Sequence, residues 1–193
     1  MSDEQVLSLA TDLEGHPDNV AACLLGGLTV AWSDGAGGHG LRLAVSDDLT
    51  PVAFVPGTSS STKAARRMLP ETVAHADAAR NAGRAALLVA ALGSRPDLLL
   101  PATEDLLHQP YRAPAMPRSA ALVDELRGSG IPAVVSGAGP TVLALTTPGT
   151  RDQALAVTRR GWSTLALDVD TGGAVLLPLE LSGSEAQDPA ELS

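Results

Sequence analysis

Two carboxylates, an imidazole and an amide lie close together near the start of the chain, in the segment EGHPDNV (residues 14–20). The segment forms a loop that leads into a predicted helix. The first turn of a helix collects partially positive N–H groups, which favour negative charge or a phosphate. The residues therefore suit two interpretations: His16 and Asp18 bind a charged ligand, or Asp18 or Asn19 caps the helix while His16 is exposed.

A second segment with chemical potential is SGAGPT (residues 136–141), which joins two apolar stretches. Glycines let a backbone approach a ligand closely and can direct N–H groups at an anion. The alternative is a tight hairpin turn, for which such a sequence is also typical. No Gly-Lys-Ser/Thr element follows, so the segment is not a P-loop.

Two arginines are candidates for binding a carboxylate: Arg66 in TKAAR (residues 62–66) and Arg112 in HQPYR (residues 108–112). An arginine side chain can hold a carboxylate through two parallel hydrogen bonds. The alternative is that both side chains are solvated on the surface, as most arginines are.

The candidate residues must be positioned by the helices and strands that the sequence predicts along the chain. Ser2 and Gln5 match a capping box at the start of the first helix. Apolar periodicity predicts helices over residues 3–13, 19–25, 71–92, 96–107, 118–128 and 151–160, and the start of a helical region at 63–68. Strands are predicted over residues 28–32, 41–45, 51–55, 131–135, 141–146, 163–169 and 173–179, with a Gly-rich turn at 33–40. This order predicts an α+β fold with an antiparallel-rich sheet.

Composition excludes several classes of function. Hydrophobic residues make up 45% of the chain and aromatic residues only 2%, so the core must consist mostly of Ala, Leu and Val. The net charge of −9 and the lack of a basic run argue against a nucleic-acid partner. No apolar run reaches the roughly 18 residues that a membrane span needs. The acidic N-terminus and the single cysteine, Cys23, predict a cytoplasmic protein without an internal disulfide.

In combination and in this order, these segments resemble the homoserine kinases of the GHMP family of small-molecule kinases. EGHPDNV followed by LLGGL (residues 24–28) resembles the homoserine kinase signature, and SGAGPTVLAL (residues 136–145) resembles the third GHMP motif. The segments STKAAR (residues 61–66) and LLHQPYR (residues 106–112) match the places where homoserine kinases carry substrate contacts. The resemblance covers nearly the whole chain.

This resemblance implies a fold and a division of the chain. Residues 1–57 would be the end of the N-terminal domain, which is like ribosomal protein S5, and would carry the homoserine-binding loop. Residues 58–182 would form the ferredoxin-like C-terminal domain, and residues 183–193 a polar tail that frays. Homodimers are usual in the family, so the resemblance also implies a homodimer.

The resemblance implies an ATP-dependent phosphorylation of L-homoserine to O-phospho-L-homoserine in threonine biosynthesis. The homoserine pocket would consist of His16, Asp18, Asn19, Arg66 and Arg112, with Asp18 facing the ammonium and the two arginines facing the carboxylate. The loop that would approach the ATP phosphates comprises Ser136, Gly137, Ala138, Gly139 and Thr141. Glu14 would bind Mg²⁺, although Asp12 is close enough to compete for that role. We assign no general base.

The sequence also departs from the family pattern. Homoserine kinases carry a Gly-Leu-Gly-Ser-Ser loop that wraps the ATP phosphates, but in this chain GTSSS (residues 57–61) follows the signature that such a loop should precede. Ala22-Cys23 stands where Pro-Ala is common. We therefore expect a chain that resembles the C-terminal two-thirds of a homoserine kinase, with weak ATP binding and little activity of its own. The alternatives are an inactive amino-acid-binding or regulatory module and a structural subunit that dimerises with a full-length relative.

Overall fold

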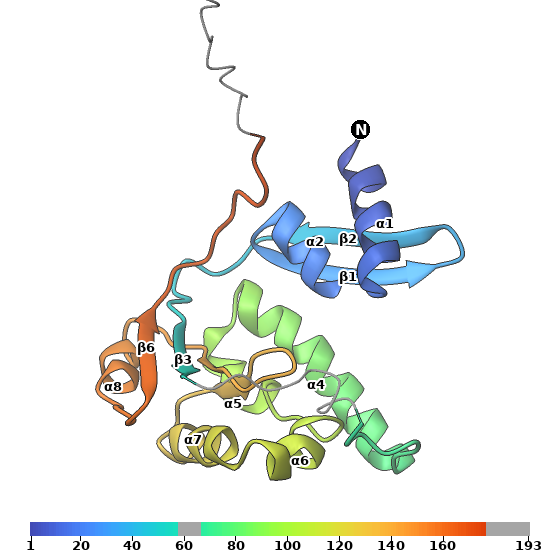
Figure 1. The fold of residues 1–193 in the computed structure, drawn as a ribbon. Helices are drawn as coiled ribbons and strands as arrows, with labels where there is room; N and C mark the ends of the chain where they lie inside the picture. Colours follow the sequence, from blue (N-terminus) through green and yellow to red (C-terminus); the bar gives the residue numbers. More distant parts are fainter. Residues whose placement is uncertain (58–66, 177–193) are drawn as a thin grey trace, which may run out of the picture.

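The computed structural model describes residues 1–57 and 67–176, which form two units (Figure 1). The N-terminal unit consists of two helices and a two-stranded antiparallel sheet: α1 (Asp3–Glu14), α2 (Asp18–Leu25), β1 (Leu28–Asp34) and β2 (Gly37–Leu43). The capping box predicted for α1 is confirmed, because the Ser2 side chain accepts from the Gln5 N–H and the Gln5 side chain accepts from the Ser2 N–H. The helix ends at Gly15, whose φ of +89° is in the left-handed region.

Both helices of the N-terminal unit lie on one face of the β1–β2 sheet, and glycines in β2 make this packing close. A Cβ added at Gly38 would collide with the Thr11 side chain, and one at Gly40 would lie 2.9 Å from Leu25 Cδ1. Sequence analysis predicted residues 33–40 as a turn, and that prediction is wrong. Only Gly35 and Ala36 lie between the strands; the glycines of β2 serve the close approach of helix and sheet.

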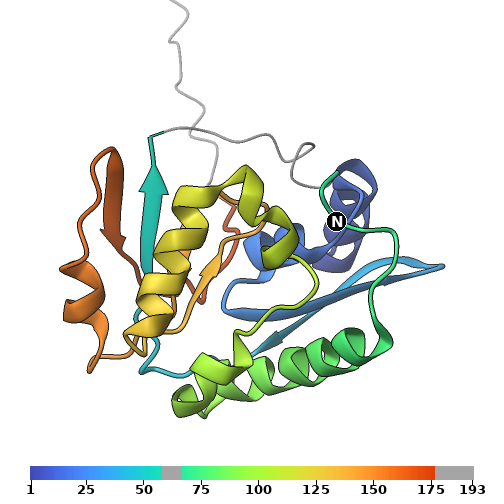
Figure 2. The same cartoon turned by 90° about the horizontal axis from the view of Figure 1, so that it is seen from below.

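The C-terminal unit consists of a four-stranded antiparallel sheet and the helices around it (Figure 2). Its strands are β3 (Val52–Pro56), β4 (Ala133–Val135), β5 (Val142–Ala144) and β6 (Trp162–Ala166), in the order β4-β5-β3-β6. Its helices are α4 (His75–Gly93), α5 (Leu99–Ala102), α6 (Gln109–Arg112), α7 (Pro117–Gly128) and α8 (Arg151–Leu155), with 3₁₀ turns at Pro96–Leu98 and Ala113–Ala115. The predicted α+β class and the antiparallel sheet are confirmed.

Two apolar clusters hold the C-terminal unit together. In the larger one, Leu122 and Leu126 of α7 pack against Val52 and Phe54 of β3 and against Val142 of β5. The smaller cluster joins α4, α5 and the end of β5 through the buried side chains Ala91, Leu99, Ala102 and Leu145. Burial of this apolar area is the main stabilising contribution of the unit.

Several predicted elements are shorter in the structure. The helix predicted for residues 96–107 ends at Ala102. Beyond it, Thr103 Oγ1 donates to the Leu99 carbonyl, and the Asp105 carboxylate accepts the N–H of Leu107. The helix predicted for 151–160 ends at Leu155, and the strand predicted for 163–169 ends at Ala166. Residues 173–176 carry no strand, and residues 177–179 lie outside the described part.

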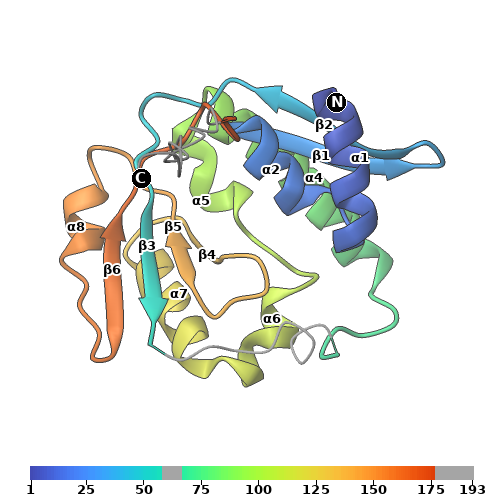
Figure 3. The same cartoon turned by 45° about the horizontal axis from the view of Figure 1, so that its top comes forward.

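After β6 the chain returns to the N-terminal unit through a return segment, residues 170–174 (Figure 3). Gly27 N–H donates to the Asp170 carbonyl at 2.7 Å, and Arg42 donates to the carbonyls of Leu25 and Thr171. At the crossing, a Cβ on Gly26 would lie 2.5 Å from the backbone nitrogen of Gly173. The return segment therefore joins the end of α2 to the C-terminal unit. Within the described ranges, no helix has the length and apolar character to cross a membrane.

Candidate functional site

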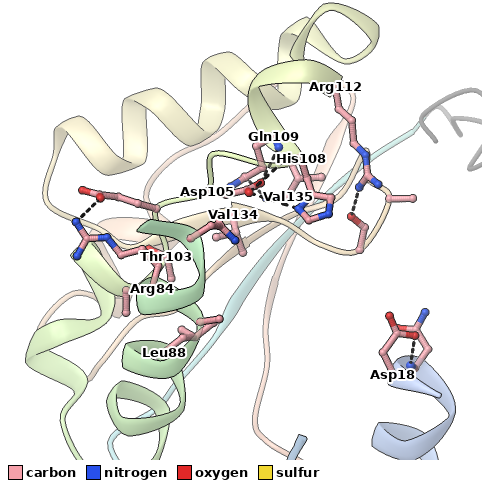
Figure 4. A pocket seen from close by; sticks show the side chains of 18 of the residues that line it. Asp18, Arg84, Leu88, Thr103, Asp105, His108, Gln109, Arg112, Val134 and Val135 are labelled. Carbon is pink, nitrogen blue, oxygen red and sulfur yellow. Dashed lines mark hydrogen bonds and ion pairs between the residues drawn. The ribbon is translucent and has the colours of Figure 1, made fainter. Parts of the chain in front are cut away.

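A cavity of about 810 Å³ lies between the two units, and residues of both units line it (Figure 4). The N-terminal wall contributes four residues that sequence analysis proposed: Glu14, His16, Asp18 and Asn19. The C-terminal wall contributes four more: Arg112, Gly137, Ala138 and Gly139. Segments more than ninety residues apart thus meet at one cavity. The individual roles of these residues remain predictions.

The N-terminal wall is a short loop between α1 and α2 in which His16 lies between two carboxylates. His16 Nδ1 is 2.5 Å from Asp18 Oδ1, and His16 Nε2 is 3.9 Å from Glu14 Oε1. Asp18 begins α2 and its Oδ1 also accepts the Asn19 N–H at 2.7 Å. The side chain of Asp18 is nevertheless 72% exposed, so its carboxylate remains accessible to a cation in the cavity.

Neither of the residues predicted to cap α2, Asp18 or Asn19, is its N-cap. The residue at the helix start is Pro17, which makes no side-chain cap hydrogen bond, and Asp18 lies in the first turn. The carboxylate of Asp18 is therefore held by local contacts, and it adds negative charge where the N–H dipoles of the helix favour it. Glu14 is also exposed and lines the cavity, and its carboxylate is a hard oxygen ligand of the type that Mg²⁺ accepts. Among the described residues, no group of three or more His, Cys, Asp or Glu side chains is arranged to hold a metal ion.

On the C-terminal wall, the one-turn helix α6 presents Arg112 to the cavity. Arg112 Nη1 donates to the carbonyl oxygen of Gly137 at 3.3 Å, which places the guanidinium beside the glycine-rich loop. Arg66, the second arginine predicted to bind a carboxylate, lies outside the described residues.

The glycine-rich loop is a hairpin turn between β4 and β5. Ser136 N–H donates to the Thr141 carbonyl at 2.9 Å, and Gly139 N–H donates to the Ser136 carbonyl at 2.9 Å. The segment therefore has the hairpin conformation that was one of the two interpretations of its sequence. Gly137 (φ +55°) has no other heavy atom near the position of a Cβ, so the loop presents bare backbone at the cavity. Its predicted contact with phosphate remains a prediction.

Sequence analysis missed several polar residues of the C-terminal wall. Asn81 and Arg84 of α4 line the cavity together with Ala85 and Leu88, at the spacing of one helix face. Two polar residues at helical spacing, on the same face as Ala85 and Leu88, were the signal that could have identified them. Asp105, which precedes α6, was also missed.

The Asp105 carboxylate accepts three backbone N–H groups. Oδ1 accepts from Leu107 at 2.8 Å and from His108 at 3.1 Å, and Oδ2 accepts from Gln109 at 2.6 Å. Burial by itself would raise the pKa of Asp105, but these N–H groups and the neighbouring His108 outweigh it and hold the pKa below the usual value. The carboxylate is therefore ionised at neutral pH and orders the turn that follows it.

The chain is similar in sequence to known small-molecule kinases. Residues 79–163 match the family described as GHMP kinases C terminal. The chain is 57% identical over 179 residues to a homoserine kinase of Streptomyces avermitilis, a match that covers 93% of this chain and 59% of the relative. A homoserine kinase of Streptomyces coelicolor is 58% identical over 93% of this chain and 58% of its own length.

A solved structure agrees with these relatives. The crystal structure of a homoserine kinase from Cytophaga hutchinsonii superposes with a TM-score of 0.72 at 25% identity, over 90% of this chain and 60% of that protein. The chain thus spans about three-fifths of the length of the homoserine kinases that it matches.

Proposed function

We propose that this chain belongs to the GHMP kinase family and that its cavity binds L-homoserine for ATP-dependent phosphorylation, because residues 79–163 match the GHMP kinases C terminal family and the chain is similar to homoserine kinases over most of its length. The observation that carries the proposal is the placement of charge. An exposed carboxylate, Asp18, and a guanidinium, Arg112, line one cavity from opposite units. An amino-acid zwitterion needs one anionic and one cationic recognition group, and this cavity offers both.

In the proposed complex, Asp18 binds the ammonium group of the substrate, with His16 and Asn19 beside it. Arg112 binds the carboxylate, and Arg66 is proposed as the second arginine of this clamp. The substrate hydroxyl then attacks the γ-phosphate of ATP, and O-phospho-L-homoserine and ADP are formed. Positioning and charge neutralisation contribute most of the catalysis in such transfers.

The glycine-rich loop is proposed to approach the transferred phosphate with its backbone N–H groups, and Glu14 to hold Mg²⁺. When bound, Mg²⁺ would neutralise charge on the ATP phosphates. We assign no proton-accepting residue. The wider setting follows the family: threonine biosynthesis, a cytoplasmic location and a homodimer. The predicted division was into residues 1–57, 58–182 and a tail at 183–193. Its first boundary differs from that between the two structural units, because β3 (Val52–Pro56) pairs with β5 and β6 in the C-terminal unit.

The 193-residue sequence contains no Gly-Leu-Gly-Ser-Ser element. We therefore propose that this polypeptide by itself turns over homoserine slowly, because the phosphates lack that loop's N–H groups. The second candidate function, an amino-acid-binding or regulatory module without catalysis, is favoured by the same observation together with the retained charged pocket. A steady-state assay with ATP, Mg²⁺ and L-homoserine separates the two, because only the enzyme forms ADP in a homoserine-dependent manner.

Calorimetry with L-homoserine tests the binding site. We expect saturable binding, and we expect Arg112→Ala to weaken it by about 10- to 100-fold, since loss of a charge-assisted hydrogen bond costs roughly 1.5–3 kcal/mol. The control is Arg95→Ala, because Arg95 pairs with Asp97 on an exposed turn outside the cavity. No binding by the unaltered chain, or equal affinity in both variants, would remove the proposed site.

A further inference from the structure

A chain of polar contacts runs along the C-terminal wall, from α4 to the strand that precedes the glycine-rich loop. It starts on α4, where Asn81 Oδ1 accepts the Leu106 N–H at 3.0 Å and Arg84 Nη2 lies 2.6 Å from Glu104 Oε2. These contacts fix the segment that carries Asp105 (Figure 4).

Asp105 is the centre of this chain. Its side chain is only 17% exposed, whereas that of Asp18 across the cavity is 72% exposed. The three N–H groups that it accepts belong to the first residues of the turn that ends in Arg112. Asp105 is therefore oriented towards the backbone, where it satisfies N–H groups that a helix of one turn leaves unpaired.

Gln109 links the same turn to the sheet. Its side-chain oxygen Oε1 accepts the N–H of Val135, the last residue of β4, at 2.8 Å. Arg112, one turn further on, donates to Gly137 at 3.3 Å, a length at the weak end of the hydrogen-bond range. The position of the guanidinium thus depends on the backbone of the turn, and the turn depends on Asp105 and Gln109.

We propose that Asp105 and Gln109 are positioning residues of the homoserine site: Asp105 orders residues 107–112, and Gln109 locks them against β4, so that the Arg112 guanidinium is held ready for the substrate carboxylate. This inference rests on the proposed function, that the cavity binds homoserine. Neither residue belongs to the apolar clusters that hold the unit together. Their removal is therefore expected to change the site more than the global stability.

The experiment combines L-homoserine calorimetry with hydrogen exchange at residues 107–112. We expect Asp105→Ala and Gln109→Ala each to weaken homoserine binding by roughly tenfold. Asp105→Asn keeps one acceptor oxygen, and Gln109→Glu keeps an oxygen that accepts the Val135 N–H. Each conservative variant should recover part of the lost affinity, and Asp105→Asn also serves if Asp105→Ala fails to fold.

The matched control is Asp34→Ala. Asp34 also accepts a backbone N–H, from Ala36 at 2.8 Å, and lies 3.0 Å from a histidine, His39, but it is the last residue of β1 and lies outside the cavity. It should leave both homoserine affinity and exchange at residues 107–112 unchanged.

The Arg112→Ala background separates positioning from a structural role. If Asp105 acts through Arg112, Asp105→Ala has little further effect on homoserine affinity once Arg112 is removed. An undiminished effect in that background would overturn the proposal. The proposal would also be overturned if Asp105→Ala exchanged faster at residues 107–112 but bound L-homoserine with unchanged affinity.

If the unaltered chain does not bind L-homoserine, the proposed function fails together with the assignment to a homoserine site, and exchange then tests only the claim that Asp105 orders residues 107–112. Faster exchange at residues 107–112 in Asp105→Ala, with no change in Asp34→Ala, would then support it. Equal exchange in the two variants would overturn it.

Discussion

The two units that line the cavity are built differently. In the N-terminal unit, few of the described side chains are buried, among them Leu7, Thr11 and Ala21, and two helices lie on a two-stranded sheet. The C-terminal unit has a four-stranded sheet with Phe54, Leu122, Leu126 and Ile131 in its core. Regions with few buried apolar contacts open at lower free energy than the global unfolding. The anionic wall of the site therefore stands on the less stable unit.

The side chains of the two walls reflect the same contrast. On the N-terminal wall, Asp18 is exposed and held by His16 and by its own neighbouring N–H. On the C-terminal wall, Arg112 is carried by a turn that Asp105 and Gln109 fix to α4 and β4. We therefore expect the cationic half of the site to be pre-organised and the anionic half to gain order when a ligand joins the two units.

The largest expected effect comes from the core of the C-terminal unit. Leu126→Ala removes a side chain that is 1% exposed and should lower the free energy of unfolding of the whole chain by about 2–5 kcal/mol. Leu7→Ala removes a side chain of the same type that is 3% exposed in the N-terminal unit. We expect it to accelerate hydrogen exchange at residues 3–43 while α7 and the four-stranded sheet stay protected. Global loss of protection in Leu7→Ala would show that the two units unfold as one.

A smaller effect is expected at the crossing between α2 and the return segment. A Cβ at Gly173 would collide with the Leu24 carbonyl, and its φ of +69° disfavours any other residue. Gly173→Ala should therefore destabilise the chain by about 2 kcal/mol or more, with the loss of protection concentrated in the N-terminal unit.

The matched control is Gly161→Ala, where φ is +78° but no heavy atom lies within 4 Å of the added Cβ. It should cost only the conformational penalty of about 1 kcal/mol. Equal destabilisation by the two variants, measured by denaturant unfolding, would contradict the view that the crossing holds the units together.

Local patterns predicted much of the fold. The capping box at Ser2 and Gln5 fixed the start of α1, because both of its contacts lie within one turn of the chain. The order of elements also predicted an antiparallel-rich sheet, but not that β3 joins the sheet of the C-terminal unit. The glycines of β2 were misread as a turn because their function, close approach to α1, depends on a contact that only the folded chain makes.

The motifs of the candidate site could be predicted from the sequence, but the contacts that hold the turn carrying Arg112 could not. The loop at residues 14–20 and Arg112 stood out by residue type and by resemblance to a family. The hydrogen bond from Val135 to Gln109 joins residues 26 positions apart, so no local pattern could reveal it. Asp105 carried a faint local signal, a carboxylate just before a short helix that contains proline.

The most direct test of the account is hydrogen exchange of the unaltered chain with and without saturating L-homoserine. If the zwitterion joins Asp18 to Arg112, the account predicts slower exchange on both walls, in α2 at residues 18–25 and in the turn at residues 107–112. The larger change should fall in α2, which stands on the less stable unit. Slowing confined to one wall, or absent from both, would contradict a substrate that bridges the two units.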